Sequence, residues 1–323
     1  MDFLTFLFPT SGVETNILAP PLVALGISFF TSMGGVSGAF LLLPFQMSVL
    51  GYTTPSVSGT NFVYNIVAIP SGVYRYFREG RMAWPLTLVV VVGTLPGVFI
   101  GYFLRVTCLP DPKTFKLFVG FVLLYIGGRL LYEMTGRAAA GKGQMKALEE
   151  KFRRRSGELK QRNDTRLAAG LPTEAVVRTI SFSCSRVTFE FWGETFSFST
   201  SGMLALAFVV GVIGGAYGIG GGAIIAPFCV AVFNLPVYAV AGAALMGTFI
   251  TSLAGVAFYS LIPAREGLAT SPDWLLGLLF GVGGFAGMYL GARFQKYVPQ
   301  KGLKLMIGLI IVFLAVNYIV QYF

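Results

Sequence analysis

Histidine is absent from this sequence, and acidic residues are scarce. The 323 residues include no histidine and only 14 Asp or Glu, none of which lies in the middle of a hydrophobic segment. Proton relays and cation sites inside membranes use such groups, and hydrolytic or metal-dependent enzymes need them as bases or ligands. We therefore expect no catalytic residue, no metal site and no cofactor, and a bound ligand that is not a cation.

Cysteine is almost as rare, with three residues scattered along the chain at Cys108, Cys184 and Cys229. Their wide spacing suggests neither a disulfide framework nor a thiolate metal site. A small apolar side chain that packs among its neighbours accounts for each of them.

Basic residues are plentiful, and the net charge is +10, but half of them lie in one stretch. Twelve Lys or Arg and five acidic residues lie between Arg137 and Arg186. Such a cluster beside apolar segments is typical of a cytoplasmic loop that anionic lipid headgroups attract. Basic charge alone is a weak signal for nucleic acid, and we expect none as a partner.

Apolar residues dominate the rest of the chain, at 55% of all residues against 12% charged, and the mean hydropathy is +0.73. They form blocks of about 17 to 20 residues, enough to cross roughly 30 Å of hydrocarbon as helices. We predict an all-α integral membrane protein of the bacterial inner membrane. The blocks are Asn16–Ser32, Pro85–Phe103, Phe115–Tyr132, Trp274–Gly291 and Leu303–Tyr322.

The sequence repeats itself at a spacing of 183 residues. The string GAFLLLPF at Gly38–Phe45 matches GGAIIAPF at Gly221–Phe228, and the match continues without a gap to Tyr76 and Tyr259. Two homologous halves therefore flank the basic loop. We predict a first transmembrane repeat over residues 16–133, a cytoplasmic basic loop over 134–200 and a second repeat over 201–323.

Each half carries a dense glycine cluster in its first apolar stretch. The 35 residues from Asn16 to Leu50 would span about 52 Å as one helix, which is too long for a single crossing. Glycine is unfavourable inside a helix, so we predict breaks at Gly34–Gly38 and Gly218–Gly222. With five segments per half the repeats are inverted, and with four they are parallel. The distribution of basic residues favours five.

The basic loop has two parts. Residues 145–167 have helical character, and the segment from Ile180 to Phe191 alternates apolar and polar residues. Alternation at period two predicts a small β-hairpin.

Polar residues follow each glycine break, at positions where few other polar groups occur. The N-termini of broken helices expose unpaired N–H groups, which favour anions. Asn61 and Asn65 lie four residues apart, on one helix face, and either bond neighbouring helices or contact a ligand. The candidate substrate-binding residues are Ser37, Gly38, Thr60, Asn61, Asn65, Tyr217, Gly221, Gly222, Thr248 and Thr251.

A second set of glycines has a different spacing. Gly93, Gly97 and Gly101 recur every fourth residue, and the second half repeats the spacing at Gly283, Gly287 and Gly291. Small residues at this spacing are typical of closely packed membrane helices. We predict a packing role for these two sets.

The motifs GGVSGAFLLLP (34–44), YGIGGGAIIAP (217–227), VSGTN (57–61) and VAGAA (240–244) resemble the TauE/SafE sulfite exporter family. The resemblance covers Leu18–Tyr132 and Gly202–Tyr322. It implies transport of sulfite or organosulfonates such as sulfoacetate, with Gly38, Gly221, Gly222, Thr60 and Asn61 in the matching positions. Ala243 and Ala244 stand where a Thr-Ser pair is expected.

Together these observations predict a transporter of small anions that works by alternating access about a midplane site. An anion channel, or a membrane receptor or enzyme with its activity in the basic loop, are the alternatives. The expected partners are a small anionic substrate, membrane lipid, a coupling proton or ion, and a second copy of the chain in a homodimer.

Overall fold

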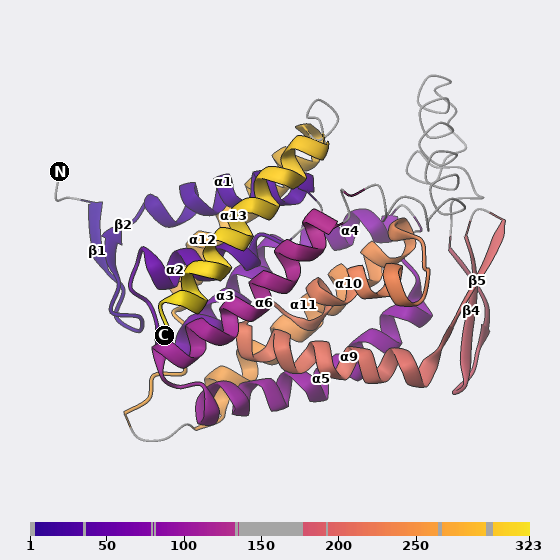
Figure 1. Ribbon diagram of the computed structural model, residues 1–323, viewed down its shortest axis with the longest axis horizontal. Coiled ribbons are helices and arrows are strands. Elements are labelled where there is room, and N and C mark those ends of the chain that lie inside the picture. The colour runs from indigo at the N-terminus through magenta and orange to yellow at the C-terminus, as the bar shows by residue number, and fades with distance from the viewer. Residues whose placement is uncertain are drawn as a thin grey trace.

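The computed structural model describes residues 4–34, 37–78, 80, 82–132, 135, 177–191, 193–263, 267–294 and 300–323. These residues form a body of packed helices with a small sheet near each end of it (Figure 1). The predicted all-α class is confirmed. The stretch 145–167, expected to be helical, lies outside the described residues.

The two halves contain corresponding helices in the same order. The first half comprises β1 (Thr5–Leu7), β2 (Glu14–Asn16), α1 (Ala19–Gly34), α2 (Ala39–Ser48), α3 (Ser56–Ala68), α4 (Pro70–Arg78), α5 (Trp84–Phe103), a π-helical turn (Leu104–Cys108) and α6 (Pro112–Tyr132). The second comprises α9 (Thr200–Tyr217), α10 (Gly221–Val232), α11 (Val237–Leu261), α12 (Trp274–Phe294) and α13 (Gln300–Val320).

Six helices in the described part of the chain are long and apolar enough to cross a membrane, which confirms a multi-pass membrane protein. The apolar helices α1, α2 and α10 are shorter. With 16 residues, α1 is about 24 Å long. The six candidate spans are Trp84–Cys108, Pro112–Tyr132, Thr200–Tyr217, Ala239–Leu261, Trp274–Gly291 and Gly302–Val320.

The largest helix contacts join one half to the other. Helix α1 packs on α12, and its repeat counterpart α9 packs on α5, the counterpart of α12. In the same way, α3 packs on α12, and its counterpart α11 packs on α5, the counterpart of α12. The last helices of the two halves, α6 and α13, pack on each other. Neither half therefore buries its apolar surface by itself.

The glycines at spacing four create these contacts between the halves. A methyl group at Gly97 would overlap the carbonyl oxygen of Phe208 in α9, and one at Gly287 would overlap the carbonyl oxygen of Leu25 in α1. The absence of a side chain lets the helix backbones approach closely. The predicted packing role is confirmed.

The segment before α9 forms a three-stranded antiparallel meander of β3 (Arg178–Phe182), β4 (Arg186–Phe191) and β5 (Glu194–Ser199), one strand more than the predicted hairpin. Strand β4 alternates, with Val187, Phe189 and Phe191 buried. The Ser199 side chain then accepts a hydrogen bond from the Gly202 N–H and caps α9. The sheet thus fixes where α9 begins.

Candidate functional site

The second glycine break is a tight reversal between α9 and α10. Gly218 and Gly220 have φ angles of 87° and 78°, a region that glycine adopts readily. The carbonyl of Gly214 accepts hydrogen bonds from the N–H groups of Gly218 at 2.9 Å and Ile219 at 3.1 Å. Helix α10 then begins at Gly221 with no side chain capping it, so its first N–H groups lack helical partners.

The glycines of this break also fit tightly against neighbouring helices. A methyl group at Gly222 would overlap the carbonyl oxygen of Ala244 and lie 2.6 Å from the Thr248 nitrogen in α11. One at Gly221 would lie 2.6 Å from the Thr94 methyl carbon in α5. Close packing therefore accounts for the glycine density, in addition to the backbone geometry.

Asn61 joins the two glycine breaks. Its side-chain N–H group donates to the carbonyl of Gly218, at the end of α9, over 3.1 Å, and to the carbonyl of Ala39, at the start of α2, over 3.3 Å. The hydroxyl of Tyr217 donates to the Phe40 carbonyl over 2.9 Å and adds a second link between the breaks. The start of α2 and the end of α9 therefore meet at one amide.

Asn65 lies one helical turn further along α3 and donates to the Ile219 carbonyl over 3.2 Å. Of the two alternatives for Asn61 and Asn65, bonding to neighbouring segments is therefore observed, and the segment they bond is the break itself. Gln46 in α2, which lies within a short apolar helix, places its amide nitrogen 3.5 Å from the Asn61 side-chain oxygen. Sequence reasoning passed over Gln46.

At the first break, Gly38 lies against the hydroxyl of the buried Tyr64. A methyl group at Gly38 would overlap the Tyr64 hydroxyl, which hydrogen-bonds the Ser28 hydroxyl at 2.8 Å. The Ser37 hydroxyl accepts a hydrogen bond from the Ala39 N–H at 3.3 Å and so supports the first turn of α2. Residues 35 and 36 of this break lie outside the described residues.

Thr248 and Thr251 face the second break from α11. A methyl group at Gly220 would lie 2.9 Å from the Thr248 methyl carbon and 3.1 Å from the Thr251 hydroxyl oxygen. Both hydroxyls donate to carbonyls of their own helix, at Ala244 and Gly247. Their polar groups are satisfied locally, so they contribute shape to the site before any ligand binds.

Thr60 belongs to a different polar network, although it neighbours Asn61 in the chain. Its hydroxyl accepts a hydrogen bond from the Asp273 N–H at 2.9 Å and lies 3.0 Å from the Tyr52 hydroxyl. One residue corresponds to about 100° around a helix, and Thr60 accordingly faces the loop before α12. The structure does not bring Thr60 together with the other candidates.

The charged side chains in the described core lie outside this cluster. Asp273 caps α12 through the Leu276 N–H and also accepts two hydrogen bonds from Ser11. Arg105 donates to the Thr53 carbonyl and lies 3.6 Å above the Phe115 ring. Among the described residues no three acidic, cysteine or histidine side chains could share a metal ion.

We use the term polar centre for the cluster formed by Gln46, Asn61, Asn65, Tyr217 and the glycine break at Gly218–Gly222. Gln46, Asn61, Asn65 and Tyr217 are each 0% exposed, and Thr248 is 2% exposed. The polar centre is therefore closed to solvent on every side.

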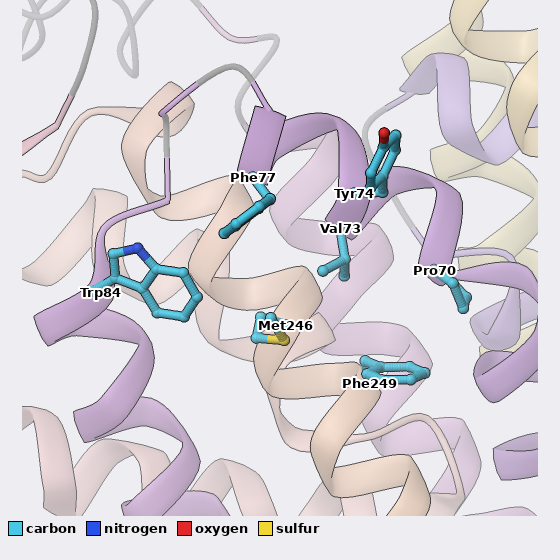
Figure 2. A pocket seen from close by; sticks show the side chains of 7 residues that line it. All are labelled: Pro70, Val73, Tyr74, Phe77, Trp84, Met246 and Phe249. Carbon is cyan, nitrogen blue, oxygen red and sulfur yellow. The ribbon is translucent and has the colours of Figure 1, made fainter.

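A separate apolar pocket of about 300 Å³ lies at the surface between α4 and α11 (Figure 2). None of the described residues that line it is charged. Its lining residues are Pro70, Val73, Tyr74, Phe77, Trp84, Met246 and Phe249. The opposite face of α11, with Thr248 and Thr251, faces the polar centre, so the pocket and the polar centre are distinct.

A family model described as sulfite exporter TauE/SafE matches residues 21–318 of the chain. The chain belongs to this family. It is 22% identical over 311 residues to the probable membrane transporter protein YunE of Bacillus subtilis, covering 93% of this chain and 97% of that protein. It is 23% identical over 297 residues to a probable membrane transporter protein of Xylella fastidiosa, covering 91% of each chain.

No solved structure matches the chain. The family match spans both halves and both glycine breaks, and the relatives are similar over nearly their whole length. The protein is therefore a membrane transporter, as its sequence predicts, and not an enzyme.

Proposed function

We propose that this transporter carries small anions, most specifically sulfite or organosulfonates such as sulfoacetate, by alternating access about the polar centre. The observation that carries the proposal is the meeting of the two glycine breaks at Asn61, whose amide bonds a carbonyl from each half. A ligand that separates these carbonyls would change how the halves contact each other.

The electrostatics of the polar centre support an anion. Helix α10 begins there without a capping side chain, and the partial positive charge of a helix N-terminus favours negative ligands. The buried carboxylate of Asp273 is engaged by Ser11 and the start of α12, away from the break. A cation would find no described carboxylate in the polar centre to compensate its charge.

The burial of the polar centre supports a carrier over an open channel. Asn61 and Asn65 are inaccessible to solvent, so a ligand reaches them only after helices move. Helix α1 of the first half packs on α12 of the second, and α9 of the second half packs on α5 of the first. A shift of one half against the other would therefore move helices on both sides of the polar centre. Figure 1 also draws α1 and α9 running in opposite senses, as inverted repeats require.

Sulfur oxyanions are favoured over other anions by the family description alone. The coupling proton or ion and the homodimer stay predictions, as does the inverted relation of the halves. A weakly acidic substrate that carries its own proton would explain coupling without a titratable side chain. Transport that is indifferent to an imposed pH gradient would contradict this explanation.

The test is uptake of sulfite and of sulfoacetate into proteoliposomes, with Asn61→Ala beside the wild type. We expect saturable uptake, reduced at least tenfold in the variant. Asn317→Ala is the matched control, because this exposed asparagine lies in α13 far along the chain and bonds only Gln321. Equal uptake by both variants, or current without saturation in planar bilayers, would overturn the proposal.

A further inference from the structure

Two buried oxygens in the polar centre have no hydrogen-bond partner in the described part of the chain. They are the side-chain oxygens of Gln46 and Asn65, and both residues are 0% exposed. An unsatisfied buried acceptor is costly, and native proteins contain few of them. The two oxygens lie on the adjacent helices α2 and α3, that of Asn65 beside the second break and that of Gln46 on a side chain that contacts Asn61. They point to a ligand that donates hydrogen bonds.

The orientation of these amides follows from backbone carbonyls, which can only accept hydrogen bonds. The Asn65 nitrogen faces the Ile219 carbonyl at 3.2 Å, so a flipped amide would place two oxygens against each other. The Asn61 nitrogen is held by two carbonyls, which leaves its oxygen facing the Gln46 nitrogen. The free atoms of Gln46 and Asn65 are therefore both acceptors.

An anion without hydrogen atoms would not satisfy these oxygens, because acceptor would face acceptor. A ligand with a hydroxyl, ammonium or protonated acid group would donate to them, while its negative group takes the N–H groups at the start of α10.

Resting on the proposed function, we propose that the transported anion carries a hydrogen-bond donor and that Gln46 and Asn65 select it. The substrate class is then a hydroxylated, aminated or protonated small anion. Of the substrates proposed above, sulfite and sulfoacetate belong to this class in their singly protonated forms and not in their fully deprotonated ones. Gln46 and Asn65 act as specificity residues, whereas the uncapped start of α10 attracts the negative group.

The test compares anions that differ only in the donor. The first pair is 2-hydroxyethanesulfonate and propane-1-sulfonate, and the second is lactate and 2-methylpropanoate; in each pair a methyl replaces the hydroxyl. Affinities are measured by calorimetry on the purified full-length chain. We expect the wild type to prefer the hydroxylated member at least tenfold, since a site with buried polar groups rejects analogues that leave them unpaired.

Gln46→Met removes the acceptor and keeps the side-chain length. We expect it to reduce the preference to threefold or less through weaker binding of the hydroxylated anion, while the affinity for the apolar analogue is unchanged. Gln321→Met, an exposed position in the last residues of the chain, is the matched control and should retain the preference. If Gln46→Met does not fold, Asn65→Thr provides the same comparison.

The outcomes separate the two proposals. Equal affinity of the wild type for both members of each pair, or an unchanged preference in the variants, overturns the inference and leaves the proposed function standing. Stabilisation by sodium chloride over choline chloride, with no preference among anions, assigns the two oxygens to a cation and also overturns the inference. Absence of binding by all four anions overturns the inference, and the uptake of sulfite and sulfoacetate then decides the proposed function separately.

Discussion

Helix α3 and the first part of α11 are repeat counterparts, yet they use their polar side chains in opposite ways. Asn61 and Asn65 of α3 donate to three backbone carbonyls, all of them outside α3 and at the two breaks. Thr248 and Thr251 of α11 bond carbonyls within α11. The asparagines of α3 therefore bond neighbouring segments, whereas the threonines of α11 bond their own helix.

The difference shows how a duplicated scaffold divides its tasks. The exchanged helix contacts keep the symmetry of the repeat, but the side-chain amides that bond other segments lie on α3. Helix α11 supplies the close-fitting surface on which Gly220 and Gly222 pack. The replacement of Asn61 by Ala244 in the second half is therefore a specialisation of that half for packing.

The largest expected effect comes from filling the second break. Gly222→Ala places a methyl group against the backbone of α11, which no rotamer change can relieve. We expect no monodisperse protein by fluorescence-detected size-exclusion chromatography. Gly38→Ala meets side-chain ends, the Tyr64 and Ser28 hydroxyls, and should yield folded protein of lower melting temperature. Equal yields of folded protein from both variants would contradict the distinction between a break packed on backbone, at Gly222, and one packed on side chains, at Gly38.

The next effect separates the outward bonds of α3 from the internal bonds of α11. Asn61→Ala leaves two buried carbonyls without that donor, and we expect a loss of about 1–3 kcal/mol in stability together with transport. Thr248→Val removes a hydroxyl bonded only within its helix and should cost less than about 1 kcal/mol. Chemical denaturation in detergent measures both. A Thr248→Val loss as large as that of Asn61→Ala would contradict the comparison.

A smaller effect is expected when α3 is given the residue of its counterpart. Asn65→Thr removes the bond to the Ile219 carbonyl, and a threonine hydroxyl in a helix bonds the preceding turn, as Thr248 does. We expect a loss of about 1 kcal/mol in stability and a reduction of several-fold in the initial rate of uptake. Unchanged uptake would show that Asn65 takes no part in transport.

The smallest effect is expected outside both helices. Replacing residues 142–176 by a flexible Gly-Ser linker of about 15 residues leaves every described contact of α3 and α11 in place, and such a linker spans roughly 20 Å. We expect uptake within twofold of the wild type in proteoliposomes. Abolished uptake in a folded variant would instead assign an essential role to the basic loop.

Much of the fold could be predicted because membrane crossing imposes a length and an apolar composition. The blocks beginning at Pro85, Phe115, Trp274 and Leu303 correspond to α5, α6, α12 and α13. The repeat also predicts which helices are counterparts. It does not predict that α1 packs on the counterpart of α5 instead of α5 itself, because both pairings bury similar apolar faces.

The candidate site was predictable only in outline. Asn61, Asn65, Tyr217 and the break glycines come together, as the polar stripe suggests. Thr60 does not join them, because motif adjacency says nothing about which way a helical residue faces. Gln46 was missed because its role depends on where α2 lies against α3, which only the tertiary structure gives.

The exchange of helices between the halves has a consequence for biosynthesis. The first turn of α1 leaves the ribosome about 255 residues before α12 begins, a delay of roughly 13–50 s at ordinary translation rates. Until Tyr217 is made the nascent first half lacks both α9 and α12, the partners of α5 and α1, and α1 then still lacks α12. Lipid, the insertion machinery or a chaperone must shield those glycine-lined faces until the ribosome finishes, so a premature stop yields a fragment suited to quality-control proteolysis.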